Sequence, residues 1–340
     1  RLMVWARAAE ANGGKGPLAA RELTGTGGSG RRGCSMAGVA TWACNCASGL
    51  TRPGMRAALG MHRDAALPEF NAAPLTETSK GKAPEINKDA PAFGRKAVLY
   101  ATCFGNYNDT AIGEATRKVL AKNGVETEVV YPRCCGMPHL EQGNIETVAE
   151  SAEATARELG EWIDKGYDVI ALVSSCALML KFEWPLIVPG DDNVKKLSGA
   201  TSDISEYLVG IAKSEGLVDG LAPLDGGVSV HIACHARAQN MGQKAAEMLR
   251  LVPDTGINVI ERCSGHGGSW GVMKDNFEVA LKVGKPVARD VKKQGPGHVV
   301  SECPLARDHI LQGVDRLDGE KLEPSTARHP IELIARAYGL

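Results

Sequence analysis

Cysteine is the residue type in this 340-residue chain with the clearest capacity for chemistry, and its spacing repeats. Seven of the ten cysteines fall into two sets: Cys103, Cys134, Cys135 and Cys176, followed by Cys234, Cys263 and Cys303. The offset between the sets is 131 residues from Cys103 to Cys234, 129 from Cys134 to Cys263 and 127 from Cys176 to Cys303. A cysteine pattern that recurs at a nearly constant offset predicts an internal duplication.

These thiols are predicted to bind metal rather than to form disulfides. No apolar export signal follows the first residue, Arg1, so we expect a cytoplasmic fragment or processed product, in which thiols stay reduced. Cytoplasmic cysteines that cluster more often bind metal or carry out redox chemistry. Thiolates are soft ligands that select zinc and iron–sulfur clusters over harder metals.

Predicted strands place the cysteines at one edge of a sheet. Buried strands are expected over Lys96–Thr102, Glu126–Tyr131 and Asp168–Val173, and again over Gly227–Ala233, Asn258–Glu261 and His298–Ser301. Helices are predicted between them, over about 110–122, 144–165, 240–251 and 276–293. This alternation predicts parallel sheets with right-handed crossovers. The carboxyl ends of parallel strands gather at one edge, so cysteines distant in sequence are expected to converge there.

The remaining sequence divides the chain into four parts. Residues 1–94 are predicted to be an irregular connector, with short helices near 2–12 and 53–60 and a loop over Gly25–Gly33. Residues 95–200 form a first module and residues 227–340 a second module with a C-terminal tail. Residues 201–226 contain a linking helix that begins with a capping box of Asp203 and Glu206.

The first set has two adjacent cysteines followed by glycine, with single cysteines 31 positions before and 41 positions after them. This pattern resembles the cysteine-rich CCG domain, which occurs in the B subunit of heterodisulfide reductase, the C subunit of anaerobic glycerol-3-phosphate dehydrogenase and iron–sulfur oxidoreductases of glycolate and lactate oxidation. The resemblance covers about residues 95–312 and is carried by the strings TCFGNYN, CCGMPHLEQGN, SSCALMLKFEWP, ACHARAQNMG and RCSGHGGSWG. It implies an α/β fold of two duplicated CCG modules, each with a parallel sheet and related by a pseudo-twofold axis.

The resemblance also implies cubane or non-cubane 4Fe–4S clusters. The first copy offers four thiolates, which suffice for a cubane cluster but lack the fifth ligand of the family's non-cubane clusters. In the second copy Ser264 replaces the paired cysteine, so three thiolates remain. His235 or His266 is expected to complete a site for iron–sulfur or zinc, with a hydrogen-bonded loop histidine as the alternative for each.

The acidic residues near Cys303 are not expected to be acid/base catalysts. Glu302 and Asp308, beside Cys303, are predicted to be solvated charges. Three further cysteines match no cluster motif and are predicted to be incidental thiols: Cys34, Cys44 and Cys46.

The function implied by the resemblance is electron transfer. The chain is expected to pass electrons between a dehydrogenase subunit, often flavin-dependent in this family, and a quinone or another acceptor. Residues 49–68 resemble the connector that follows a ferredoxin module in longer relatives, so such a module is expected upstream. The alternatives are a thiol/disulfide reductase that acts at the cluster and a zinc-stabilised, non-catalytic assembly subunit.

Composition excludes some partners. A net charge of −1 and a pI near 6.8 give no electrostatic basis for binding nucleic acid or an anionic membrane surface. The longest apolar stretch, Val169–Leu180, contains two serines and is followed by charged residues, so it is predicted to be a buried strand running into a helix. We therefore expect a cytoplasmic protein without a membrane span, held at the inner face of the membrane only through partners.

Overall fold

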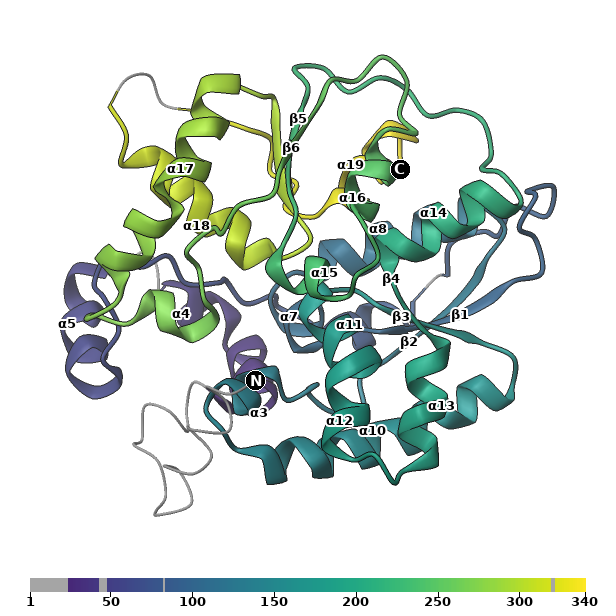
Figure 1. The fold of residues 1–340 in the computed structure, drawn as a ribbon, viewed down its shortest axis with the longest axis horizontal. Coiled ribbons are helices and arrows are strands. Elements are labelled where there is room, and N and C mark those ends of the chain that lie inside the picture. Colours follow the sequence, from purple (N-terminus) through teal and green to yellow (C-terminus); the bar gives the residue numbers. More distant parts are fainter. Residues whose placement is uncertain (1–23, 43–47, 82, 319–321) are drawn as a thin grey trace.

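The computed structural model describes residues 24–42, 48–81, 83–318 and 322–340 (Figure 1). Its described strands form two sheets in which every neighbouring pair is parallel. The first sheet has the order β2-β1-β3-β4, with β1 Lys96–Tyr100, β2 Glu126–Val130, β3 Asp168–Ala171 and β4 Thr201–Asp203. The second has the order β6-β5-β7, with β5 Val228–His231, β6 Ile257–Ile260 and β7 His298–Ser301. The shared order confirms the predicted duplication.

A layer of helices lies between the two sheets and forms a core common to both modules (Figure 1). This layer consists of α8 Thr110–Lys122, α14 Ile204–Ser214, α16 Lys244–Leu249 and α19 Pro330–Ala337. Leu99 of β1 and Val230 of β5 are fully buried in this core. The two modules therefore fold around one shared hydrophobic core.

The outer faces of the two sheets are covered by separate sets of helices. On the first sheet, Val98 and Tyr100 of β1 point away from the shared core toward α10 Ile145–Asp164 and α13 Asp192–Ala200. On the second sheet, Ile260 and Val299 pack against α17 Phe277–Gln294 and α18 Pro304–Asp315. Burial on both faces explains the apolar runs in the inner strands β1 and β3.

Helix starts follow the local sequence. The predicted capping box is present at α14: the Ser205 N–H donates to Asp203 Oδ1 (2.9 Å), and the Asp203 N–H donates to Glu206 Oε2 (3.3 Å). Short helices follow the strand ends, namely α7 Cys103–Tyr107, α9 Met137–Glu141, α11 Ser174–Leu178, η2 Met179–Glu183, α12 Trp184–Ile187, α15 Cys234–Ala238 and η3 Gly268–Val272. None of the described helices has both the length and the apolarity needed to cross a bilayer.

The N-terminal segment differs from its prediction. The predicted loop over Gly25–Gly33 is wrong, because α3 spans Thr26–Ser35. A Cβ on Gly33 would lie 2.3 Å from the Phe70 ring and one on Gly30 2.4 Å from the Tyr107 ring, so close packing stabilises a helix of low intrinsic propensity. The other N-terminal helices are α4 Ala37–Thr41, α5 Ser48–Leu59 and α6 Leu75–Thr78. The helix predicted near 2–12, and Cys44 and Cys46, lie outside the described residues.

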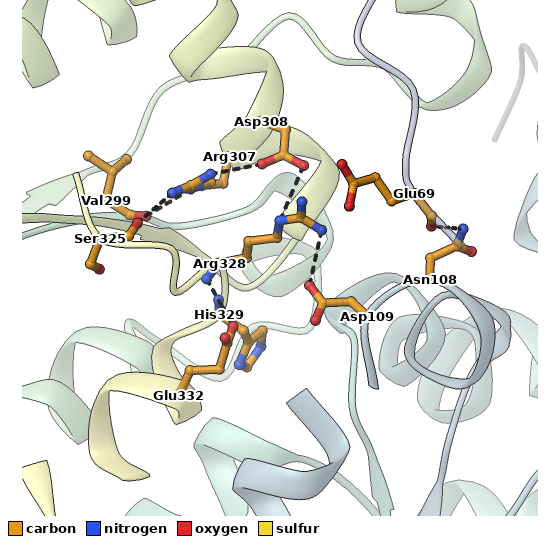
Figure 2. Close-up of polar contacts among 10 residues, drawn as sticks. All are labelled: Glu69, Asn108, Asp109, Val299, Arg307, Asp308, Ser325, Arg328, His329 and Glu332. Carbon is orange, nitrogen blue, oxygen red and sulfur yellow. Dashed lines mark hydrogen bonds and ion pairs between the residues drawn. The ribbon is translucent and has the colours of Figure 1, made fainter. Parts of the chain in front are cut away.

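The C-terminal tail ties the two modules together through a polar network (Figure 2). Arg328 lies between Asp109 of the first module (3.5 Å) and Asp308 of α18 (3.6 Å). Arg307 pairs with the same Asp308 at 3.0 Å and also donates to the Ser325 carbonyl at 2.8 Å. The expectation of a solvated charge at Asp308 is therefore wrong, since the tail folds back over this side chain.

Asp109 should make stability depend on pH. Burial, together with the Glu332 charge, raises its pKa to about 7 despite the opposing charge of Arg328. The folded state then binds more protons than the unfolded state between about pH 4 and pH 7, so the free energy of unfolding falls as pH rises through that window. We expect Asp109→Asn to reduce this slope in urea unfolding measured at a series of pH values.

The matched control for that variant is Asp192→Asn, which changes an exposed aspartate paired with Lys195 at the start of α13. It should leave the slope unchanged. Some slope will survive in Asp109→Asn, because burial also raises the pKa of Asp203, to about 6, and that of Glu332. An Asp109→Asn protein with the full wild-type slope would contradict the assignment.

Candidate metal centre

The four cysteines of the first set meet at the carboxyl edge of the first sheet. Cys103 begins α7 after β1, Cys134 and Cys135 follow β2, and Cys176 lies in α11 after β3. The sulfur atoms of Cys103 and Cys134 are 3.8 Å apart, and the Cys135 thiol hydrogen bonds with Cys134 and Cys176. The structure therefore joins the four predicted thiols in one continuous chain of contacts.

The thiol contacts shift the pKa values of the first set in opposite directions. Hydrogen bonding with Cys103 and Cys135 lowers the pKa of Cys134 well below its ordinary value. Hydrogen bonding with Cys134 raises the pKa of Cys103 and of Cys135 well above the ordinary value, and burial adds to both shifts. Thr26, from the N-terminal helix α3, also lies 3.3 Å from the Cys134 sulfur through its hydroxyl. Metals bind the thiolate form, and these contacts favour that form at Cys134.

The loop that carries each central cysteine is held by the last residue of the strand beside it. In the first module the Tyr100 hydroxyl donates to the carbonyl oxygen of Arg133 at 2.6 Å. In the second module His231 Nε2 donates to the carbonyl of Arg262 at 2.9 Å, while its Nδ1 accepts from Ser301. Tyr100 and His231 lie three positions before the first cysteine of each set, a repeat in the sequence that could have revealed them.

Glycine lets both central loops turn sharply. Gly136 and Gly265 have φ values of +82° and +81°, which a residue with a side chain rarely adopts. A Cβ on Gly265 would lie 2.0 Å from the Ala280 carbonyl oxygen of α17. A Cβ on Gly136 would lie 3.2 Å from Val148 of α10, so the two loops pack on α10 and α17.

Backbone strain is present immediately before Cys103. Thr102 has a φ of +59°, an outlier for a β-branched residue, and its side chain is fully buried. Its hydroxyl accepts a hydrogen bond from the Gly105 N–H at 3.0 Å. Such strain costs on the order of 1–3 kcal/mol and persists only where the surrounding structure fixes it. The backbone at Thr102 is thus fixed in the conformation that allows α7 to begin at Cys103.

The second set is more open than the first. Cys234 and Cys263 are exposed, and Cys303 is half-buried at the N-cap of α18. Arg237 donates to the Cys234 sulfur and the Gly265 N–H to the Cys263 sulfur, both at 3.4 Å. Burial raises the pKa of Cys303 to about 11. These contacts are to nitrogen donors, so the second set lacks the thiol-to-thiol chain of the first.

Both predicted histidines lie beside the second set, and a third accompanies them. Burial, with the charges of His309 and His235, lowers the pKa of His266 to about 3; burial also lowers the pKa of His235. The rings of His266 and His309 are 5.9 Å apart. His309 was missed because α18 was not predicted, although Pro304 after a strand end is a common first helical residue. Neutral imidazoles are the form that binds metal.

Side chains of both cysteine sets line one cavity of about 510 Å³. The first set contributes Cys103, Cys135 and Cys176, and the second contributes Cys303 beside the three histidines. Another wall consists of apolar side chains of the N-terminal segment, including Met55, Leu59 and Met61. This segment, predicted to be a connector, therefore forms part of the site.

A buried carboxylate near the cavity also differs from its prediction. Glu302 is fully buried rather than solvated, and the Ala233 N–H donates to it at 3.4 Å. Burial raises its pKa well above the ordinary value. Its carbonyl oxygen accepts a hydrogen bond from the Ser174 hydroxyl at 3.2 Å, so the third strand ends of the two modules are in contact.

The donor sets fit iron–sulfur clusters to different degrees. Four thiolates from three neighbouring loops are a common ligand set for a 4Fe–4S cluster, in which each thiolate binds its own iron. Among the residues with a described position, no three His, Cys, Asp or Glu side chains converge on a point that one metal ion could occupy. The first set therefore fits a cluster, whereas the second offers three thiols and needs a further donor.

Comparisons with known proteins identify the repeated unit. The family model of the cysteine-rich domain, CCG, matches residues 97–181 and 228–305. The C subunit of anaerobic glycerol-3-phosphate dehydrogenase from Escherichia coli (strain K12) is 27% identical over 247 residues, which cover 71% of this chain and 59% of the relative. The B subunit of fumarate reductase (CoM/CoB) from Methanothermobacter marburgensis is 27% identical over 254 residues, covering 72% of this chain and 47% of the relative.

A shorter relative and a solved structure extend these matches. Lactate utilization protein A of Geobacillus thermodenitrificans is 29% identical over 187 residues, covering 52% of this chain and 74% of the relative. A hypothetical protein from Helicobacter pylori has a similar fold, with a TM-score of 0.50 at 9% identity over 78% of this chain and 54% of that one. The chain spans less than two thirds of its first two relatives. It carries two copies of the cysteine-rich CCG domain.

Proposed function

We propose that the chain is an iron–sulfur electron-transfer subunit of an oxidoreductase complex. The observation that supports this most directly is the chain of contacts among the four thiols of the first set. A 4Fe–4S cluster bound by Cys103, Cys134, Cys135 and Cys176 would supply one-electron redox chemistry. Two relatives are named as subunits of a dehydrogenase and of a reductase, which agrees with this role.

The surrounding residues favour a rigid first site. Cys135 and Cys176 are 2% and 4% exposed. The Trp184 indole N–H donates to the Cys135 carbonyl oxygen at 3.0 Å, and this tryptophan is fully buried. Partners that fix the ligands and exclude water set the potential of such a site and limit its reorganisation. The first site is thus suited to exchanging electrons rather than to binding a substrate.

The second set is proposed to hold a second metal group, either iron–sulfur or zinc. Cys234, Cys263 and Cys303 would bind it, with His235 or His266 as the further donor. Cys234 and Cys263 are exposed, which supports a docking site for a partner at the carboxyl edge of the second sheet. The proposed partners are a flavin-dependent dehydrogenase subunit and a ferredoxin-like module, in the cytoplasm or at the inner face of the membrane.

A redox titration monitored by EPR on anaerobically purified chain tests the proposal. We expect a paramagnetic signal that appears and disappears reversibly, with sulfide present in proportion to iron. Bound metal that gives no redox-dependent signal at any potential would contradict an electron-transfer role.

A thiol/disulfide reductase is the second candidate, and the cavity shared by both sets favours it. Turnover of oxidised glutathione or another small disulfide by the isolated chain, with a reduced dye as electron donor, distinguishes the two functions. Steady turnover would show that the chain is a reductase rather than an electron carrier. A chain that titrates reversibly but does not turn over the disulfide would support the electron-transfer role.

A further inference from the structure

Tyr131, immediately after β2, carries a buried hydroxyl that nothing described in the chain satisfies. Its ring stacks on that of Tyr100, with centroids 6.4 Å apart, and meets the Tyr107 ring edge-on at 5.5 Å. Its hydroxyl oxygen is inaccessible to solvent and has no hydrogen-bond partner among the described residues. Buried hydroxyls in folded proteins are nearly always paired, so an unpaired one needs an explanation.

The hydroxyl of Tyr131 lies against α3, the helix that also contacts a thiol of the first set. A Cβ on Gly27 of α3 would lie 3.1 Å from the Tyr131 oxygen. The preceding residue, Thr26, has its hydroxyl 3.3 Å from the Cys134 sulfur. Burial first, then the charges of Cys103 and Cys134, raise the pKa of Tyr131. A phenol hydroxyl is protonated at neutral pH and donates toward a negatively charged group.

Packing does not explain the hydroxyl. In the strand register Tyr100 pairs with Val130 and His231 pairs with Ile260, so Ile260 corresponds to Val130, and Glu261 corresponds to Tyr131. Glu261 is exposed. The second copy of the fold therefore forms without a buried hydroxyl at this position.

We propose, building on the proposed function, that the Tyr131 hydroxyl donates a hydrogen bond to a sulfur atom of the first cluster. A donor to sulfur stabilises the reduced state more than the oxidised state, because reduction adds negative charge. Tyr131 is thus a positioning residue that raises the reduction potential of the first site. The second site, with the exposed Glu261 at the corresponding position, has no equivalent buried donor.

The test is the midpoint potential of Tyr131→Phe, measured by EPR-monitored titration with iron and sulfide determined on the same samples. The ring contacts with Tyr100 and Tyr107 remain in this variant. We expect unchanged iron and sulfide and a roughly tenfold change in the oxidised–reduced equilibrium, which is a fall of about 59 mV for one electron. The matched control is Tyr167→Phe, whose hydroxyl bonds to Glu126 at the start of β2, and its potential should equal that of the wild type.

Two results would overturn the inference. The first is a wild-type potential in Tyr131→Phe with full iron content, and the second is loss of iron from the variant, which would make the hydroxyl a requirement for assembly. If the wild-type chain itself gave no redox-active cluster, the proposed function would fail before the variant was compared. The two failures are therefore separable.

Discussion

Cys135→Ser is expected to lose the first cluster while the chain remains folded. Cys135 is 2% exposed and its thiol contacts both Cys134 and Cys176, so it is central to the four-thiol chain. The first set has four thiolates and no spare, and a serine hydroxyl is a poor replacement for a soft sulfur ligand. We expect the iron bound per chain to fall by about four, the content of one 4Fe–4S cluster, with matching loss of sulfide. Iron and sulfide analysis, with circular dichroism as the check on folding, measures both parts.

The matched control for Cys135→Ser is Cys34→Ser. Cys34 is also buried, at 6% exposed, and its thiol donates to the Tyr107 carbonyl oxygen at 3.3 Å, a bond that serine can replace. It belongs to neither repeated set, so Cys34→Ser should retain its iron. Unchanged iron in Cys135→Ser would contradict the ligand assignment, as would an equal loss in both variants.

Gly265→Ala is expected to destabilise the second module strongly. The new Cβ would lie 2.0 Å from the Ala280 carbonyl oxygen and 2.9 Å from the Gly284 nitrogen, both in the backbone of α17. The residue also has a φ of +81°, which alanine adopts only with strain. Backbone strain and overpacking each cost on the order of 1–3 kcal/mol, so we expect the free energy of unfolding to fall by about 3 kcal/mol or more. Urea unfolding followed by circular dichroism measures the change.

Gly210→Ala provides the contrasting substitution. Gly210 lies inside α14, and a Cβ there would meet no atom within 4 Å. Alanine should stabilise the helix by about 0.5–1 kcal/mol, because glycine loses more backbone entropy on folding. A Gly265→Ala protein as stable as the wild type would show that the loop does not pack on α17 as described.

The strands and the convergence of the first cysteine set could be predicted because their signals are local. Lys96–Tyr100 is an apolar run with a cysteine three residues after it, and the same pattern recurs 131 residues later. β4 was missed because three residues, Thr201–Asp203, carry no recognisable period. The gathering of the strand ends at one edge of the sheet follows from the parallel topology, which cannot be recognised from any single segment.

The features that sequence patterns could not reveal depend on contacts between distant segments. The glycine-rich sequence of α3 predicts a loop, and the helix is explained only by its packing against Phe70 and Tyr107. Arg328 belongs to the C-terminal tail in the sequence, but in the structure it bridges Asp109 and Asp308 of the two modules. The shared cavity likewise exists only once the N-terminal segment has packed over both cysteine sets.

The most direct test of the account is the iron, sulfide and zinc content of the wild-type chain, purified without oxygen and accompanied by an EPR spectrum. The account predicts at least about four irons per chain, an equal amount of sulfide and a signal that changes on reduction. Zinc without iron or sulfide would contradict it, because the duplicated cysteines would then be structural and the chain could not carry electrons through them.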